Sequence, residues 1–307
     1  MILAENPPDK IMVPAFAPNI SKDDPRLVKV SERIRSQLLE AAQQQIKPQD
    51  LEFEAKIGVV SFNERADRTN PDVRDILAKT QNNQTWHILP PAKYDPSKPG
   101  AYSFTPSMQS FEKECPVSQR DAFGKLLGDF TRAKDFNPHV EALGKTRQRD
   151  ETYPDGTRAT YMCADLRQNR YEEKPSAVIT KKRLFDLNIK SASVPSGPLP
   201  TMSADLRISC STETASKVPQ NQGVKLTRIK ERTSFKFNWM RLDMTVTQSS
   251  NKGKSELDYE VELEICDVNY LMGYVGDEIA FRSIIRRFLQ NAAMLTKFLA
   301  HGRRELR

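Results

Sequence analysis

The sequence LEFEAKIG spans residues 51–58, and DYEVELEI spans residues 258–265. In an extended strand, side chains two residues apart point to the same face. The first segment therefore gathers its charges on one face, which carries Glu52, Glu54 and Lys56. The second segment does the same with Glu260, Glu262 and Glu264. Apolar side chains fill the opposite faces, so both segments predict β-strands with one charged and one apolar face.

Three further segments alternate in the same way: ADLRISCSTE (204–213), TRIKER (227–232) and MRLDMTV (240–246). The polar face of the first carries Arg207, Ser209 and Glu213. The polar face of the second carries Arg228, Lys230 and Arg232, and that of the third carries Arg241, Asp243 and Thr245. The charged faces therefore include one that is wholly acidic and one that is wholly basic.

A sheet with one solvated face is the simplest explanation for any one of these strands. It fits the whole set less well, because glutamates in a row on one face repel each other and Glu is disfavoured in strands. Acidic and basic faces complement each other in a closed barrel with a polar interior and an apolar exterior. Amphipathic helices would cover that exterior, and apolar spacing predicts them at residues 25–45, 118–131 and 278–299.

Turn signals divide the rest of the chain into further strands. KTRQRDETY, the turn Pro154-Asp155-Gly156 and TRATYMCADL predict a hairpin. Further strands are predicted near residues 176–190, 204–213, 225–236, 239–248 and 256–266. The expected fold class is α+β, with an eight-stranded antiparallel β-barrel, a charged interior and helices outside. Residues 23–307 are expected to form this domain, and the Pro-rich residues 1–22 a flexible arm.

Composition narrows the chemistry. The 307 residues carry a net charge of +7, which suits a polyanionic partner such as a nucleic acid or a polyphosphate. No apolar run approaches the roughly 20 residues that cross a bilayer, and the N-terminus lacks a signal-peptide pattern, so an intracellular protein without membrane contact is expected. The four cysteines and three histidines show no metal-ligand spacing. The chemistry must therefore rest on carboxylates, Arg and Lys.

A polar barrel interior with both charges suits phosphoryl chemistry. Carboxylate oxygens hold hard cations such as Mg²⁺ or Mn²⁺, whereas Arg and Lys hold phosphate oxygens. Together they neutralise the charge on a transferring phosphoryl group. A triphosphate is long and highly anionic, and the acidic groups would repel it without a metal. The pattern therefore predicts a metal-dependent enzyme that acts on a triphosphate.

The motifs ExExK (Glu52, Glu54, Lys56) and ExExE (Glu260, Glu262, Glu264) resemble the two metal-binding glutamate motifs of the triphosphate tunnel metalloenzymes. Further segments are similar to the fungal and protozoal RNA 5′-triphosphatases of mRNA capping: TRAT, TKKRLFDL, DLRISCSTE, RIKERTSF and RLDMT. The resemblance covers roughly residues 25–300, and the motifs keep the family's order and spacing.

The resemblance implies that the chain removes the γ-phosphate from 5′-triphosphate RNA and leaves a 5′-diphosphate end, with Mg²⁺ or Mn²⁺ as cofactor. The implied metal ligands are Glu52, Glu54 and Glu264. The implied catalytic residues are Arg158, Lys230 and Arg232, which clamp the γ-phosphate, together with Glu213, Glu260 and Glu262. The implied phosphate-binding residues are Lys56, Lys182, Arg207, Ser209, Arg228, Arg241, Asp243 and Thr245.

Two assignments stay open at this stage. Either Glu213 or Glu262 orients or activates the attacking water. Arg147, Arg149 or Arg167 could take the role given to Arg158.

The resemblance also implies a nuclear homodimer that works with mRNA guanylyltransferase or the RNA polymerase II machinery. The family's Trp-rich peptide that docks guanylyltransferase is not evident, because Trp86 and Trp239 fall inside the predicted fold.

Two other functions compete. Tripolyphosphatases, nucleoside or thiamine triphosphatases and class IV-like adenylyl cyclases share ExExK, but they are shorter and lack a matching RIKERTSF…RLDMT pair. A non-enzymatic RNA-binding barrel fits poorly, because TRIKER has no aromatic residue for stacking and the acidic motifs repel RNA.

Overall fold

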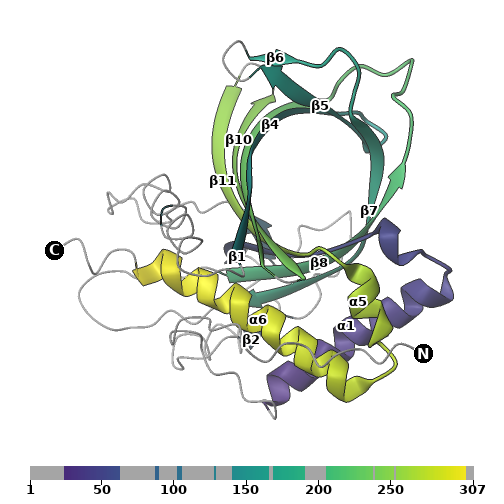
Figure 1. Cartoon of the computed structure of the whole chain (residues 1–307), viewed down its shortest axis with the longest axis vertical. Helices are drawn as coiled ribbons and strands as arrows, with labels where there is room; N and C mark the ends of the chain where they lie inside the picture. Colours follow the sequence, from purple (N-terminus) through teal and green to yellow (C-terminus); the bar gives the residue numbers. More distant parts are fainter. Residues whose placement is uncertain are drawn as a thin grey trace.

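A computed structural model describes residues 24–62, 87–89, 102–105, 128, 140–165, 169–190, 205–237, 239–251 and 254–301. Its main feature is a ring of antiparallel strands seen end-on in Figure 1. The ring strands are β1 (Leu51–Phe62), β4 (Val140–Thr152), β5 (Thr157–Asp165), β7 (Ala177–Lys190), β8 (Asp205–Ala215), β9 (Leu226–Phe237), β10 (Met240–Asn251) and β11 (Lys254–Ile265). The predicted eight-stranded barrel is therefore confirmed.

The barrel closes because each ring strand has two neighbours. Around the ring the order is β7, β8, β1, β11, β10, β9, β4 and β5, and β5 then pairs with β7. The pairing of β1 with β11 joins segments from the two ends of the domain, and its register sets Glu54 opposite Glu264. This one pairing brings the two glutamate motifs side by side.

Three short strands lie outside the ring: β2 (His87–Ile88), β3 (Tyr102–Thr105) and β6 (Arg170–Tyr171). Beyond Gly58, β1 leaves its partners in the barrel wall and pairs with β3 instead. In that pairing Phe104 is opposite Val60. β3 therefore borders the ring where β1 leaves it.

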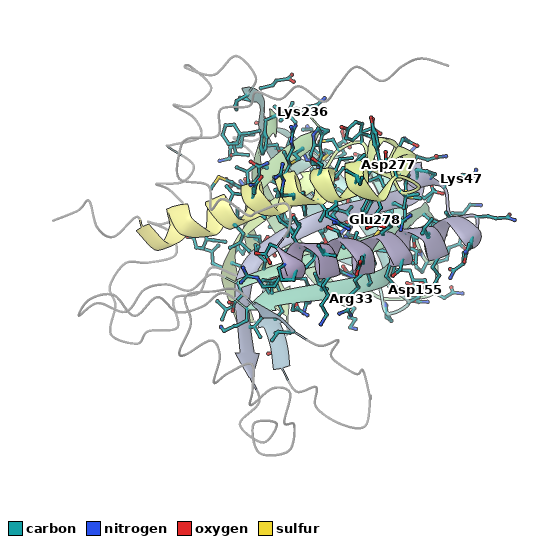
Figure 2. All side chains as sticks on the ribbon, turned by 90° about the horizontal axis from the view of Figure 1, so that it is seen from below. Arg33, Lys47, Asp155, Lys236, Asp277 and Glu278 are labelled. Atoms are coloured by element: carbon teal, nitrogen blue, oxygen red, sulfur yellow. The ribbon has the colours of Figure 1, made fainter. Side chains whose placement is uncertain are left out.

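The apolar core lies between the outer wall of the barrel and the helices. The helices that the structure describes are α1 (Pro25–Gln43), α5 (Val268–Gly273) and α6 (Glu278–His301), with a short 3₁₀ turn, η1 (Pro48–Asp50). Figure 2 shows α1 and α6 running side by side along one flank of the barrel. Phe53 is fully buried there, and its ring lies 6.3 Å from that of Phe185 and 5.3 Å from that of Phe288 on α6.

The sequence explains how α1 begins and which face it buries. The Asp24 carboxylate accepts the backbone N–H of Arg26 at 2.9 Å, and Pro25 opens the first turn. The helix then buries one stripe, which carries Leu27, Val30, Ile34 and Leu38. The predicted helices at 25–45 and 278–299 are thus confirmed as α1 and α6. Within the predicted helix at 118–131 only Gly128 is described, and it is helical; the arm at 1–22 lies outside the described residues.

None of the helices within the described ranges is both long and apolar enough to cross a membrane.

Candidate active site in the barrel interior

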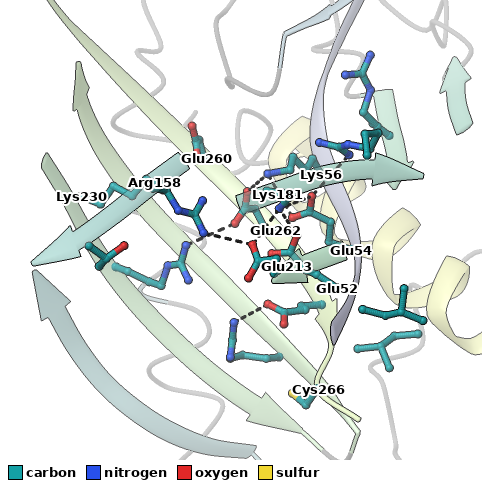
Figure 3. A pocket seen from close by; sticks show the side chains of 18 of the residues that line it. Glu52, Glu54, Lys56, Arg158, Lys181, Glu213, Lys230, Glu260, Glu262 and Cys266 are labelled. Carbon is teal, nitrogen blue, oxygen red and sulfur yellow. Dashed lines mark hydrogen bonds and ion pairs between the residues drawn. The ribbon is translucent and has the colours of Figure 1, made fainter. Parts of the chain in front are cut away.

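The barrel interior holds a cavity of about 650 Å³ that is lined mainly by charged side chains (Figure 3). Its acidic lining consists of Asp50, Glu52, Glu54, Glu213, Glu260, Glu262 and Glu264. Its basic lining consists of Lys56, Arg158, Lys181, Arg183, Arg207, Arg228, Lys230, Arg232 and Arg241. The inward side chains come from β1, β5, β7, β8, β9, β10 and β11, so strict alternation aims both charges into one space.

The acidic cluster is built on the β1–β11 pair. Glu54 is opposite Glu264, and Glu52 lies on the same face of β1 two residues earlier. Glu54 is only 3% exposed. The Ser209 hydroxyl on β8 donates to Glu54 Oε1 at 3.1 Å. These three carboxylates are the ones that the sequence assigned to metal binding.

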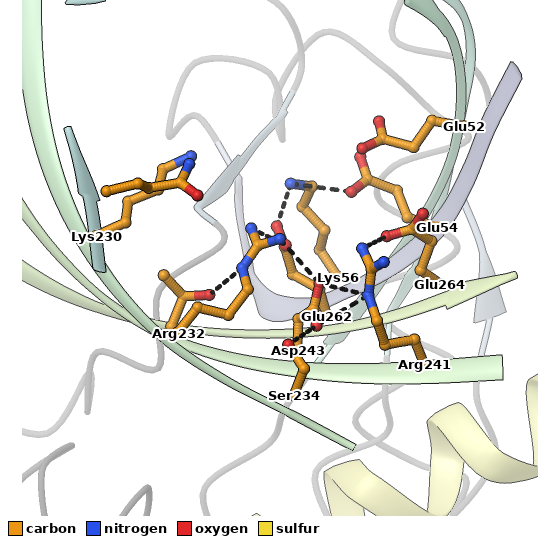
Figure 4. A network of polar contacts seen from close by, with 12 residues as sticks. Glu52, Glu54, Lys56, Lys230, Arg232, Ser234, Arg241, Asp243, Glu262 and Glu264 are labelled. Carbon is orange, nitrogen blue, oxygen red and sulfur yellow. Dashed lines mark hydrogen bonds and ion pairs between the residues drawn. The ribbon is translucent and has the colours of Figure 1, made fainter. Parts of the chain in front are cut away.

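Cationic side chains partly neutralise this cluster. The Lys181 ammonium pairs with Glu52 and lies 3.8 Å from Glu54 Oε1. On the other side, Arg241 Nη2 lies 2.5 Å from Glu264 Oε2 (Figure 4). Within the part of the chain that the structure describes, no three His, Cys, Asp or Glu side chains converge closely enough to hold a metal ion as they stand.

Two of the three carboxylates are costly to ionise without a further cation. Burial raises the pKa of Glu54; Lys56 opposes this rise, and the nearby Glu262 adds to it. Burial also raises the pKa of Glu264 to about 7, against the opposing charge of Arg241. A buried surplus of carboxylate oxygens is the donor set that a hard divalent cation prefers. The carboxylate oxygens of Glu52, Glu54 and Glu264 are therefore suitable ligands for a divalent ion.

This surplus predicts a pH-dependent stability of the metal-free protein. Because the pKa of Glu264 is about 7 when folded and 4.5 as its ordinary value, the folded state binds more protons between those pH values. Its stability therefore falls as pH rises through that window. Glu264→Gln is expected to stabilise the metal-free protein at pH 8 by up to about 3 kcal/mol, with no gain near pH 4. Thermal unfolding with a chelator measures this.

The matched control is Glu231, which lies on the outer face of β9. Its side-chain hydrogen bond to Lys145 lowers the pKa of Glu231, so Glu231→Gln is expected to change stability in the opposite direction. A Glu264→Gln variant that is less stable than wild type at pH 8 would contradict the inference that buried carboxylate charge exceeds the charge of the neighbouring cations.

The basic side of the cavity is built on β9. Lys230 Nζ lies 2.8 Å from a fully buried carboxylate, that of Asp150 on β4. Arg232 Nη1 lies 3.0 Å from Asp243 Oδ2, and Arg232 Nη2 lies 3.7 Å from Glu262. Burial lowers the pKa of Lys230, although Asp150 opposes this change. Both cations are thus held in place on the inward face.

Four predicted phosphate-binding residues do not line the cavity, and three of them are buried: Ser209, Asp243 and Thr245. Asp243 holds Arg232 and Arg241, and Thr245 accepts a hydrogen bond from Arg232 Nε at 3.2 Å. Ser209 bonds to Glu54. The sequence-based assignment is corrected here: these side chains position the lining residues, because they are buried behind them.

The prediction of Lys182 as a lining residue is also wrong. Lys182 is exposed, whereas Lys181 and Arg183 line the cavity. The cause is a register shift in β7 between Arg183 and Phe185. In a regular strand, Lys182 would share the face of Asp186, four residues later. The bulge adds one residue between them, so Lys182 lies on the opposite face and Lys181 and Arg183 point inward.

The two neighbouring lysines make a matched pair for testing this correction. Lys181→Ala is expected to reduce turnover about tenfold, because it removes from the cavity lining a cation that can bind phosphate oxygens. Lys182→Ala is expected to keep turnover close to wild type. Steady-state phosphate release measures both variants. Loss in Lys182→Ala with none in Lys181→Ala would reverse the assignment.

The structure distinguishes between the arginines that the sequence left open. Arg158 lines the cavity, and its Nη2 lies 3.2 Å from Glu213 Oε1. Arg149 faces outward, with its guanidinium over the ring of Tyr161 at 4.6 Å. Arg147 pairs with Glu231 on the outer face. Arg167 lies outside the described residues. Arg158 is therefore the candidate that the geometry favours.

Several residues of the site were not predicted from the sequence, among them Asp50, Phe104, Lys181 and Arg183 in the lining and Asp150 as the partner of Lys230. Alternation in KTRQRDET shows that Asp150 lies on the opposite face of the strand from Arg147 and Arg149. It does not show which of the two faces points into the barrel, because that depends on how the ring closes.

An enclosed barrel that sets buried carboxylates beside Arg and Lys side chains defines the class of protein as a tunnel-type phosphohydrolase. The family described as "mRNA capping enzyme, beta chain" matches residues 23–301. The chain belongs to this family, and its activity is that of an RNA 5′-triphosphatase in mRNA capping, a hydrolase.

Solved structures agree with the fold. The RNA triphosphatase Pct1 of S. pombe, in complex with the Spt5 CTD, superposes with a TM-score of 0.62 at 19% identity. That match covers 91% of this chain and 97% of the other. A second structure of Pct1 gives a TM-score of 0.61 at 19% identity and covers 94% and 97% of the two chains. No curated protein sequence matches significantly.

Proposed function

We propose that the chain hydrolyses the γ-phosphate of 5′-triphosphate RNA in the barrel interior, with a divalent cation bound by Glu52, Glu54 and Glu264. The observation that carries this proposal is the β1–β11 register, which sets Glu54 opposite Glu264 within the same cavity as Lys230 and Arg232. A triphosphate needs both charges, because its oxygens must be neutralised on several sides.

The carboxylates would hold Mg²⁺ or Mn²⁺, which supplies a positive charge next to the transferring phosphoryl group. Lys181 and Arg241 now occupy these carboxylates, so they would give up part of their contacts when the cation binds. Both are long side chains on strands other than β1 and β11, and both line the cavity. They can therefore turn toward phosphate oxygens instead.

Arg158, Lys230 and Arg232 would bind the γ-phosphate. Each of them already has a carboxylate partner that fixes its position: Glu213 for Arg158, Asp150 for Lys230 and Asp243 for Arg232. Arg232 offers a planar fork that suits two phosphate oxygens, whereas Lys230 acts as a point charge. Stabilisation of the charge on the equatorial oxygens is the main catalytic contribution expected of such side chains.

The contacts favour Glu213 over Glu262 for orienting the attacking water. Although burial alone would raise the pKa of Glu262, the charges of Lys56 and Arg232 outweigh it and hold that pKa below its ordinary value. Glu262 is only 7% exposed and is tied to both cations. Glu213 lies at the cavity surface beside Arg158, where a γ-phosphate would bind.

The substrate range separates this proposal from its main alternative, an inorganic tripolyphosphatase or nucleoside triphosphatase of the same tunnel class. Triphosphate-ended RNA and tripolyphosphate should be compared at matched concentrations with Mg²⁺ or Mn²⁺. The proposal expects higher kcat/KM for RNA and an RNA product with a 5′-diphosphate end. Turnover of tripolyphosphate with none of RNA would favour the alternative.

The cellular setting is part of the same proposal. Capping acts on nascent transcripts, so we place the protein in the nucleus, working with an mRNA guanylyltransferase. The S. pombe relative was solved with the Spt5 CTD, which supports a contact with the RNA polymerase II machinery here. A homodimer is proposed by analogy with the family. Sedimentation of the purified chain tests the last point.

A further inference from the structure

Among the described side chains that line the cavity, one is aromatic. It is Phe104 on β3, and most of the other lining side chains are charged. Its ring is partly exposed. An apolar ring in such a lining does not serve the phosphate chemistry, because it can neither neutralise nor hydrogen-bond phosphate oxygens. Its place in the cavity therefore calls for a different part of the substrate.

The position of Phe104 relative to the carboxylates is set by the strand register. Phe104 is opposite Val60, at the part of β1 that has left the barrel wall. Its ring nevertheless reaches back over the guanidinium of Arg207, whose Cζ lies 4.5 Å from the ring centroid. Arg207 is opposite Lys56 on β1, two residues and about 7 Å beyond Glu54. The ring thus lies beyond Lys56 along β1, on the side away from Glu52 and Glu54.

Arg207 is itself oriented within this arrangement. Its Nε donates to Asn188 Oδ1 at 2.8 Å, and its Nη1 lies 3.8 Å from Asp186. A guanidinium held under an aromatic ring keeps its N–H groups pointing around the ring edge. If a phosphate of the substrate binds to Arg207, the ring of Phe104 lies next to it, on the side away from Glu52 and Glu54.

We infer that Phe104 stacks on the base of the first nucleotide and so orients the RNA 5′ end with its γ-phosphate toward Glu54. The inference rests on the proposed function and adds the nucleoside subsite to it. Every base has a π face, so stacking on Phe104 accepts any 5′ nucleotide. Tripolyphosphate has no base and gains nothing from this side chain.

The test compares Phe104→Ala, Phe104→Trp and wild type on triphosphate-ended RNA and on tripolyphosphate. For Phe104→Ala, kcat/KM on RNA is expected to fall roughly 5- to 100-fold, the range for loss of one base–aromatic stack. The loss should be mostly in KM, and tripolyphosphate turnover should stay within about twofold of wild type, since no base is present to stack. Phe104→Trp should retain turnover of RNA, because it keeps a π face.

The outcomes separate the claims. An equal loss on both substrates means that Phe104 only positions Arg207, which overturns the inference and leaves the proposed function intact. Unchanged RNA kinetics in Phe104→Ala overturns it in the same way. A wild-type protein that hydrolyses tripolyphosphate but not RNA overturns the proposed function and this inference together.

Discussion

Replacing Glu54 by alanine is expected to lower phosphate release from triphosphate-ended RNA by at least about 100-fold, the usual cost of removing one key electrostatic group from an active site. Glu54 is the most buried of the three carboxylates proposed as metal ligands. In the sheet, Glu54 lies between Ser209 on β8 and Glu264 on β11. Glu264→Ala is expected to cause a loss of similar size.

The same change should leave the barrel folded. Burial disfavours the ionised form of Glu54, so the carboxylate contributes little net stability in the metal-free protein. Lys56 keeps its partner Glu262 when Glu54 is removed. Glu54→Gln preserves the volume and the acceptor for Ser209, and it serves as a second variant. Near-wild-type turnover in either Glu54 variant would end the metal assignment.

The second large effect is expected at Arg232. Arg232→Ala should reduce turnover by about 100-fold or more, and Arg232→Lys should remain clearly impaired, because an ammonium cannot reproduce the planar fork on two phosphate oxygens. Asp243 would still be held by Arg241 and by the Ser234 hydroxyl, which donates to Asp243 Oδ1 at 2.6 Å. The structural cost is therefore limited.

Glu231 is the matched control for Arg232, since it is the neighbouring residue in β9 and faces outward with Lys145 and Arg147. Glu231→Ala should keep wild-type kcat. Thermal unfolding of all three variants checks that they are folded. Full activity of Arg232→Lys would show that a point charge at this position is sufficient, and the proposed fork would then be wrong.

The sequence predicted the inward faces well wherever a strand alternates without interruption. In β1 and β11, every second residue is charged and the intervening residues are apolar, so the phase was unambiguous at Glu54 and Glu264. At Arg232 on β9 the phase was less clear, because its neighbours Glu231 and Thr233 are polar as well. Burial of the apolar face fixes which side chains point inward. A shift of the strand by one residue would turn Phe53 and its neighbours out of the apolar core.

The prediction of inward-facing side chains failed in two situations. In one, a bulge interrupts the alternation along a strand; in the other, the position of a side chain depends on contacts between segments far apart in the sequence. The resemblance assigned Lys182 to the interior, but the bulge in β7 turns Lys181 inward instead, and no residue type in TKKRLFDL indicates that bulge. Phe104 was missed because it lies on a four-residue strand whose partner, β1, is distant in sequence. Asp243 was read as facing a phosphate, but its burial shows that it supports the arginines.

The central claim is that facing carboxylates from β1 and β11 and cations from β9 act together on one triphosphate, with a divalent ion. Release of label from γ-labelled, triphosphate-ended RNA tests it most directly, in wild type and Glu54→Gln, with Mn²⁺ or with a chelator. We predict rapid release only for the wild-type protein with Mn²⁺, and an RNA product that ends in a diphosphate. Equal release in the chelator, or from Glu54→Gln with Mn²⁺, would contradict the account.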